Sequence, residues 1–509
     1  MKHLLPSILL SLAASALAAP IPPGTPYALD EIRGHAAFER SCARIGILKF
    51  QFQFPDEEAP VLDFLRKHDV VDTAVNFRTD SKPTVHILSL SPADRQAFLD
   101  LFAESWTREP DTPEGWQVFV PPSAAFRYHI AAVDGKTAFS KDPDALRAAL
   151  DLYPTLPDRL PADGDIVFQF GGEDVMRTSF LPPAIAAEIQ GNVDTLTFGL
   201  GTDADSLALH AILAPRPLAK LAAYLRRTCG PIPPSTACVN LPGAIAFLVE
   251  GPSDPSSSRF WGSSIPPGSS SALAGRIDNQ PFSAAFYPPA TPGAIPRALF
   301  FQGVNNLPTA RSALRSLFGR HSDALSLASA APYRDIPVDT LDIASADALQ
   351  TLLSHSISNS TSLAFIGALA ELNPSLSFAW LPNGLLLAFN DTDFSLLHGA
   401  IDAVLDGTTT PLDQISVFQA AVPAAEAPVR SLIHLDLPAI APYLPRPFNS
   451  ICHQVPAPCP LDLVASGAPG TSLVLRLRAP LSLPQAFAAP RHTQKPGGTP
   501  PPQSFTPAK

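Results

Sequence analysis

The chain has 509 residues, of which 46% are hydrophobic and 16% are charged, and its formal net charge is −11. At roughly 150 residues per domain this length predicts two to four domains, and the apolar content is sufficient for buried cores. The acidic balance and the lack of a basic stripe argue against a nucleic-acid-binding protein, so we expect no nucleic-acid partner. The 58 prolines are spread along the whole chain and predict many short connections.

The N-terminus has the pattern of a secretory signal peptide. Residues 1–3 are cationic, residues 4–17 are almost entirely apolar, and residues 16–18 are the small-x-small site of a signal peptidase. We place cleavage between Ala18 and Ala19, because a proline directly after the cut would block the peptidase. The apolar run is too short for a retained membrane helix, and no later run reaches roughly 18 apolar residues. We therefore expect a periplasmic or extracellular protein without an integral membrane segment after cleavage.

The first part of the mature chain predicts strands and a well-capped helix. Residues 19–26 form a proline-rich lead-in, and the globular part is expected from Ala43, with strands at residues 45–54 and 84–90. A helix should begin at Pro92, because Ser91 is a suitable N-cap and proline suits the first helical position. Apolar residues then recur at a spacing of three to four, which indicates one buried helix face.

The following segments continue the alternation of strands and helices. Residues 116–120 and 127–139 predict strands, the latter turning at Asp134-Gly135, and a second helix is expected after Asp142. Further expected elements are strands at 165–170 and 193–213, a helix at 218–225, an exposed loop or linker at 251–296, and a disordered tail at 491–509.

The strand–helix pattern occurs twice. Three pairs of segments match in the same order: 92–102 with 308–318, 135–153 with 384–404, and 206–209 with 472–475. Helix capping and hydrophobic periodicity also favour similar residues in unrelated strand–helix units, so chance similarity is the alternative explanation. The sequence predicts an α+β fold with two duplicated halves, residues 19–239 and 240–490. Each half would be a mostly antiparallel sheet with helices packed on one face.

One pattern in both halves supports a resemblance. A glycine-turned hairpin precedes an aspartate-started helix at 382–406 and, more loosely, at 134–151. In this respect the chain resembles domains of unknown function in exported bacterial proteins, over about a third of its length. The resemblance implies a bacterial exported protein and implies no activity.

Cysteine chemistry in an exported protein favours disulfides. Short loops would be closed by pairing Cys229 with Cys238 and Cys452 with Cys459, which leaves Cys42 without an assigned partner. Sequence alone does not fix connectivity. A metal site at Cys452, His453 and Cys459 lacks the usual ligand spacing, so we expect no metal and no cofactor.

No motif for catalysis stands out. The chain lacks G-x-S-x-G, S-x-x-K, H-E-x-x-H and a phosphate-binding loop, and Gly199-Leu200-Gly201 lacks the third glycine of a dinucleotide site. His434 lies two residues from Asp436, so strand alternation would place both on one face, as in a base and its orienting carboxylate. His86 and His210 lie in predicted strands, where packing roles are commoner. Further acidic candidates are residues 56–58, 173–174 and 391–393, of which Asp391 and Asp393 suit helix capping.

The sequence therefore predicts a non-enzymatic exported protein, a binding or scaffolding module of the periplasm or cell surface. Its partner would be an unknown envelope or extracellular ligand. The alternative is a secreted hydrolase whose scattered carboxylates or histidines meet in a cleft between the two halves.

The disulfide hypothesis predicts two short loops in the exported protein. Mass mapping under non-reducing conditions should give peptides that join Cys229 to Cys238 and Cys452 to Cys459, because residues close in sequence pair at low entropic cost. Any other pairing would contradict the loop-closure argument.

Overall fold

The computed structural model describes the chain in sixteen segments. They are residues 26–45, 59–77, 84–123, 125–171, 190, 192–203, 205–216, 243–251, 280–291, 296–319, 325–343, 375–407, 429–443, 455, 457–467 and 472–483. The signal peptide, the helix expected at 218–225 and the C-terminal tail lie outside these segments and remain predictions.

Most of the described chain belongs to one 20-stranded sheet. The strands of the N-terminal part are β1 (Pro26–Ile32), β2 (Val71–Phe77), β3 (Thr84–Ser89), β4 (Thr107–Glu109), β5 (Gln117–Val120), β6 (Tyr128–Val133), β7 (Lys136–Ser140), β8 (Ile166–Gly171), β9 (Val193–Thr202) and β10 (Ser206–Pro215). Those of the C-terminal part are β11 (Ala246–Glu250), β12 (Phe282–Tyr287), β13 (Arg297–Gly303), β14 (Leu325–Ser329), β15 (Val338–Ile343), β16 (Leu376–Leu381), β17 (Gly384–Phe389), β18 (Val429–Asp436), β19 (Pro460–Ser466) and β20 (Leu473–Pro480).

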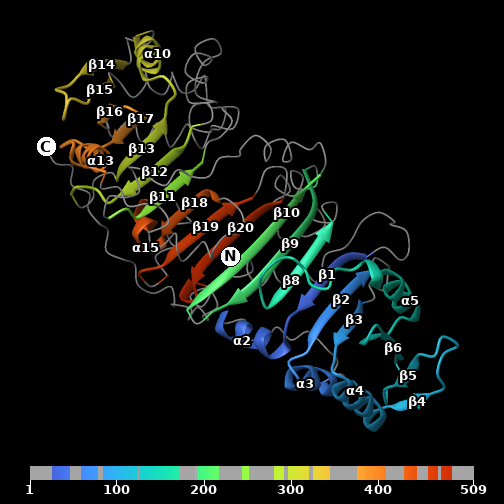
Figure 1. Cartoon of the computed structure of the whole chain (residues 1–509). Coiled ribbons are helices and arrows are strands. Elements are labelled where there is room, and N and C mark those ends of the chain that lie inside the picture. Colours follow the sequence, from blue (N-terminus) through green and yellow to red (C-terminus); the bar gives the residue numbers. More distant parts are fainter. Residues whose placement is uncertain are drawn as a thin grey trace, which may run out of the picture.

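The strand pairings give a single path across the sheet, and all of them are antiparallel. The order is β4-β5-β6-β7-β3-β2-β1-β8-β9-β10-β20-β19-β18-β11-β12-β13-β17-β16-β15-β14. The result is a long, twisted ribbon with β10 and β20 near its middle (Figure 1). Such a sheet exceeds the roughly ten strands usual for open twisted sheets.

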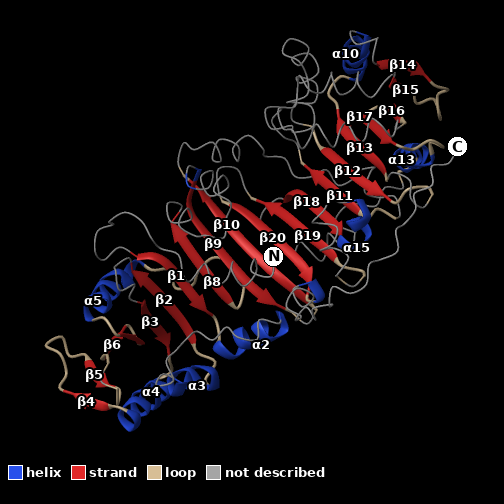
Figure 2. Cartoon of the chain, turned by 180° about the vertical axis from the view of Figure 1, so that it is seen from behind, coloured by secondary structure: helices blue, strands red, loops and turns tan. Residues whose placement is uncertain are grey.

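Helices lie along this ribbon and complete an α+β architecture, as the sequence predicts (Figure 2). They are α2 (His35–Ile45), α3 (Ala59–Lys67), α4 (Pro92–Ser105), α5 (Pro143–Leu152), α10 (Leu307–Gly319), α13 (Ser395–Leu405) and the single turn α15 (Leu437–Ile440), with the short 3-10 helices η2 (Tyr153–Thr155) and η5 (Ala441–Tyr443). In the part of the chain that the structure describes, no helix is both long and apolar enough to cross a membrane.

The local signals read from the sequence place several of these elements correctly. Ser91 caps α4 by accepting a hydrogen bond from the Asp94 backbone N–H at 3.1 Å. The turn between β6 and β7 has positive φ at Asp134 (43°) and Gly135 (79°), the backbone of a tight two-residue hairpin. The predicted strands at 116–120, 127–139, 165–170 and 193–213 correspond to β5, to β6 and β7, to β8, and to the hairpin of β9 and β10.

The helices cover both faces of the sheet and not one. In the N-terminal part, α4 packs against Leu88 through Phe98 and Phe102, whereas α5 packs against Ile87 through Leu146. Neighbouring residues of a strand point to opposite faces, so α4 and α5 lie on opposite sides. In the C-terminal part α10 and α13 are divided in the same way, against Leu385 and Leu387 and against Leu386 and Ala388. Hydrophobic periodicity shows that a helix has a buried face but not which side of a sheet it covers.

Three expectations about boundaries are wrong. The folded part begins before Ala43, since β1 and α2 precede it, and Ile45 ends a helix where a strand was predicted to begin. The other residues of that predicted strand lie outside the described segments. Strand β12 occupies part of the segment 251–296 that was expected to be an exposed loop or linker. Proline and glycine density concealed this short strand in the C-terminal part of the segment.

The cap of α5 generates a stability prediction. Asp142 accepts hydrogen bonds from the backbone N–H groups of Asp144 and Ala145, at 2.9 and 3.0 Å. Asp142→Ala should therefore lower the free energy of unfolding by about 1 kcal/mol, measured by urea denaturation. Asp151→Ala, near the other end of α5, is the matched control and should have no such cost. Equal effects of the two substitutions would contradict the capping role.

Candidate functional site

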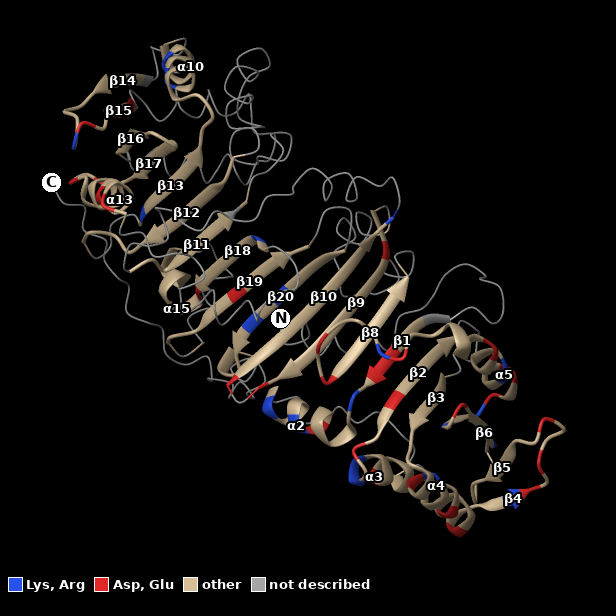
Figure 3. Ribbon diagram, viewed as in Figure 1, with Lys and Arg blue, Asp and Glu red and all other residues tan. Residues whose placement is uncertain are grey.

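The N- and C-terminal parts of the sheet meet along β10 and β20. Eight residue pairs stand in antiparallel register there, from Ser206 opposite Pro480 to Leu213 opposite Leu473. The sequence suggested a site between the halves, so this junction is where converging carboxylates and histidines are of most interest. We use the name junction face for the side of strands β10, β20, β19 and β18 that carries His210, Arg478 and Asp462. In Figure 3 a blue stretch of β20 lies beside a red stretch of β19, so basic and acidic residues are neighbours there.

A histidine–aspartate pair lies on the junction face. His434 of β18 is directly opposite Asp462 of β19, and Nδ1 is 2.7 Å from Oδ1. Both residues are buried, and the imidazole stacks on Phe247 of β11 with 4.9 Å between ring centroids. The pair is fixed by strand register on one side and by ring stacking on the other.

This pair corrects the partner that the sequence suggested for the histidine. His434 is bonded to Asp462, whereas Asp436 accepts a hydrogen bond from the Cys459 backbone N–H at 3.4 Å. Asp462 was missed because strand pairing, not sequence proximity, brings it to the imidazole. The available signal was a lone carboxylate within the otherwise apolar strand β19.

Two arginines of β20 reach across the junction to acidic groups of the N-terminal part. Arg478 lies opposite Asp462; its Nε donates to Ser206 Oγ at 2.9 Å, and its Nη2 is 3.4 Å from Asp203. The Arg476 Nη2 is 3.6 Å from Asp163. Each such partly exposed ion pair contributes little on its own. Together with the backbone ladder, these contacts connect the two parts of the chain.

His210 on β10 belongs to the same face and lies against Asp163. Its Nδ1 is 2.7 Å from the Asp163 backbone nitrogen and 3.0 Å from the Asp163 carboxylate Oδ2. Burial, followed by the charge of Arg476, lowers the pKa of His210. Its Nε2 is buried without a hydrogen-bond partner among the described residues.

The glycines that resemble part of a nucleotide loop have a packing role here. The segment containing Asp163 and Gly164 lies directly on β9, and a Cβ at Gly199 would be 1.9 Å from the Asp163 carbonyl oxygen. A Cβ at Gly201 would be 3.2 Å from the Gly164 Cα. Glycine at these positions lets the segment that bears Asp163 approach His210.

The junction face lacks the further groups that hydrolysis would use. A histidine–aspartate pair orients a base, but covalent catalysis also needs a nucleophile within hydrogen-bond reach of the imidazole. Among the described residues no serine, threonine or cysteine is hydrogen-bonded to His434 or His210; Ser206 is bonded to Asp203 and Arg478. Nor are any three His, Cys, Asp or Glu side chains of the described residues placed so that they could hold a metal ion together.

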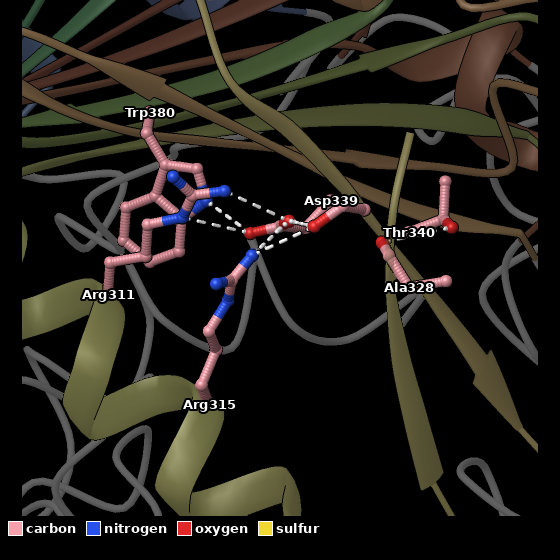
Figure 4. A network of polar contacts seen from close by, with 7 residues as sticks. Arg311, Arg315, Ala328, Asp339, Thr340 and Trp380 are labelled. Carbon is pink, nitrogen blue, oxygen red and sulfur yellow. Dashed lines mark hydrogen bonds and ion pairs between the residues drawn. The ribbon is translucent and has the colours of Figure 1, made fainter. Parts of the chain in front are cut away.

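A second polar network lies near the far end of the C-terminal part (Figure 4). The fully buried Asp339 of β15 accepts hydrogen bonds from Arg311 and Arg315 of α10, from Trp380 Nε1 at 2.9 Å and from Ser329 Oγ at 3.0 Å. Burial opposes ionisation of Asp339, but these donors outweigh it and lower its pKa. The network ties α10 to three strands, which indicates a structural role.

The other acidic candidates divide into caps and residues outside the described segments. Asp391 accepts from the backbone N–H groups of Leu396 and Leu397 at 3.2 and 2.8 Å, and Asp393 accepts from that of Ser395. Their helix-capping role is thus confirmed. Residues 56–58 and 173–174 and the serine-rich stretch 262–271 fall outside the description. His86 lies on β3, far along the sheet from the junction face.

The cysteine pairings remain predictions. Cys459 is buried at the start of β19, but its proposed partner Cys452 is outside the described residues, as are Cys229 and Cys238. Cys42 on α2 is a buried free thiol, and burial raises its pKa to about 12. A thiol with so little thiolate is a poor nucleophile.

Comparison with known proteins adds partial similarities only. No protein-family model and no curated protein matches the chain. Crystal form I of TP0453 is similar over 38% of this chain and 79% of its own, with 13% identity and a TM-score of 0.23. Crystal form IV is similar over 40% and 82%, with 14% identity and a TM-score of 0.25. At such TM-scores the likeness establishes neither a shared fold nor a shared function.

The Asp339 network predicts a strong effect of a small substitution. Asp339→Asn should lower the free energy of unfolding by about 3 kcal/mol at pH 7, because two arginines lose their buried counter-charge. Asp63→Asn, at an exposed ion pair, is the matched control and should change it by less than about 1 kcal/mol.

The pH dependence provides a second readout of the same variant. Because the folded-state pKa of Asp339 is lowered, its contribution is present above the unfolded pKa of about 4 and is lost as the pH falls below it. The difference between wild type and Asp339→Asn in urea denaturation should therefore shrink in acid. A difference that is constant with pH would contradict an ionised Asp339.

Proposed function

We propose that the chain arose by internal duplication and that its two halves correspond strand for strand. The strand order supports this, because it is repeated from each end of the sheet toward the middle. The order β4-β5-β6-β7-β3-β2-β1-β8-β9-β10 has the counterpart β14-β15-β16-β17-β13-β12-β11-β18-β19-β20. Helices α4 and α10 follow equivalent strands, as do α5 and α13. The sequence matches fall on these same equivalent elements.

The contact between β10 and β20 is consistent with this duplication. These strands are equivalent in the two proposed halves, and they pair with each other in antiparallel register. Two copies related by a two-fold axis meet in this manner, through the same surface of each. The proposed halves, residues 19–239 and 240–490, would thus form a pseudo-symmetric dimer within one chain.

For the whole chain we propose a non-enzymatic role as an exported binding or scaffolding module of the bacterial periplasm or cell surface. The observation that carries this proposal is the state of the junction face. Its arginines, carboxylates and imidazoles bind one another: Arg478 binds Asp203 across the two halves, and His434 binds Asp462 within the C-terminal half. These contacts hold the sheet together, and no nucleophile among the described residues is hydrogen-bonded to the imidazoles.

The opposite side of the same strands supports a binding role. Leu209, Leu477 and Leu463 stand in adjacent positions on β10, β20 and β19, and all three are half-buried. They form part of a broad aliphatic surface in the middle of the ribbon. Apolar surfaces of this kind are typical of proteins that bind other molecules. Export itself rests on the predicted signal peptide.

A secreted hydrolase is the second candidate, and one observation favours it. The 2.7 Å contact between His434 and Asp462 is the geometry of a base with its orienting carboxylate. Such an enzyme would require a nucleophile or an activated water supplied from outside the described residues.

An activity screen separates these two candidates. The full mature chain would be assayed against ester, glycoside and peptide substrates, together with His434→Gln and the control His129→Gln on β6. The binding-module proposal predicts no turnover that depends on His434, because no nucleophile among the described residues is hydrogen-bonded to its imidazole. Turnover that survives His129→Gln and falls at least 100-fold in His434→Gln would establish the hydrolase instead.

A further inference from the structure

The start of α2 lies over a buried carboxylate on the sheet. His35, the first residue of α2, and Asp72 of β2 are each 3% exposed, and His35 Nε2 is 3.6 Å from Asp72 Oδ2. The same oxygen is 2.9 Å from Nδ1 of His86 on β3. The carboxylate of Asp72 therefore lies between two imidazoles, one from a helix and one from a strand.

A second carboxyl group is close to this cluster. Asp30 of β1 is on the same face, because Ile32, two residues further along β1, stands opposite Asp72. The Asn76 amide donates a hydrogen bond to Asp30 Oδ2 at 2.7 Å and is itself bonded to Thr84. Asp30 interacts electrostatically with both His86 and Asp72. The site thus contains two acids and two imidazoles.

The neighbours of the cluster on β7, on the buried side of α2 and after α3 are aromatic, neutral or acidic. Strand β7 presents Phe139, whose ring stacks on His86. The buried side of α2 beyond His35 consists of Phe38, Ser41, Cys42 and Ile45. Asp69, which follows α3, accepts hydrogen bonds from the Ala36 and Ala37 backbone N–H groups and adds negative charge. The two imidazoles are therefore the side chains that contact the Asp72 carboxylate in this cluster.

We propose that Asp30, Asp72, His35 and His86 form a pH-sensitive latch. It fixes the start of α2 to the sheet in mildly acidic solution and loosens it as the pH rises above neutrality. Below neutral pH Asp30 is uncharged, and Asp72 is the one carboxylate held between the two imidazoles. Above neutral pH Asp30 ionises as well, and the two buried carboxylates repel each other with little hydration.

The titration of the two carboxyl groups has the sign that this latch requires. Burial raises the pKa of Asp30 to about 7, against the hydrogen bond from Asn76. Burial also opposes ionisation of Asp72, but His86 and His35 outweigh it and hold the Asp72 pKa well below its usual range. Because the folded-state pKa of Asp30 is raised, the contribution of this group to folding stability is fully present below about pH 4. That contribution is lost as the pH rises through about 7.

Opening the latch would uncover apolar surface. Helix α2 covers Ile166, Phe168 and Leu200 on the adjoining strands β8 and β9. These side chains lie next to the half-buried leucines of the central strands, so release of α2 would extend that surface. The latch is independent of whether the chain is a binding module or an enzyme.

Hydrogen exchange of the full mature chain tests the latch. Protection factors of the α2 amides, corrected for intrinsic exchange, would be compared at pH 5.5 and pH 8. They should fall on the order of tenfold at the higher pH, whereas those of α5 on the opposite face should stay constant. Equal α2 protection at both values would overturn the proposal, and this comparison needs no variant.

Two substitutions assign the effect to the cluster. Asp30→Asn keeps an acceptor for Asn76 and removes the ionisable group, so α2 should retain most of its protection at pH 8. His35→Gln removes one imidazole from beside Asp72, so protection at pH 5.5 should drop toward the wild-type value at pH 8. A full tenfold pH response in both variants would also overturn the proposal.

Discussion

The backbone hydrogen bonds between β10 and β20 join the strands of the N-terminal and C-terminal parts into one continuous sheet. Without these eight register pairs, each part of the chain would end in a long, unpaired strand with free N–H and C=O groups. Pairing the two strands satisfies both edges at once. It also brings into contact residues more than 250 positions apart in sequence, such as Ser206 and Arg478.

The side chains around this ladder follow from it. Register places Arg478 opposite Asp462 and Asp462 opposite His434, so polar groups of three adjacent strands lie side by side on one face. A buried ion pair by itself is weak support for stability, but it penalises any shift of register that would separate the charges. A slip by one residue would also move the alternating leucines of β20 to the wrong face. Charge and hydrophobicity therefore select the same alignment.

The buried polar clusters elsewhere share one design. Asp339 fixes α10, Asp391 fixes α13 and Asp72 lies under α2, so a carboxylate attaches a helix to the sheet in each case. The three clusters differ in the groups that bind the carboxylate. Arginines remain cationic at any physiological pH and backbone N–H groups do not titrate, whereas imidazoles lose their charge near neutrality. The proposed latch at α2 is therefore the contact of the three that would respond to pH near neutrality, whereas the Asp339 network responds in acid.

The sequence by itself determined the elements whose signals are local. Ser91 and Asp142 mark helix starts, Asp134-Gly135 marks a hairpin, and antiparallel strands follow from alternation, because caps, turns and pleats depend on residues a few positions apart. Local signals also missed β1, α2 and β12: the two strands lie beside proline-rich segments, and α2 lies before the point at which the globular part was expected to begin. Tertiary structure decided which side of the sheet each helix covers, that β10 pairs with β20, and that His434 meets Asp462 and not Asp436. These choices depend on long-range packing and register, which no local spacing encodes.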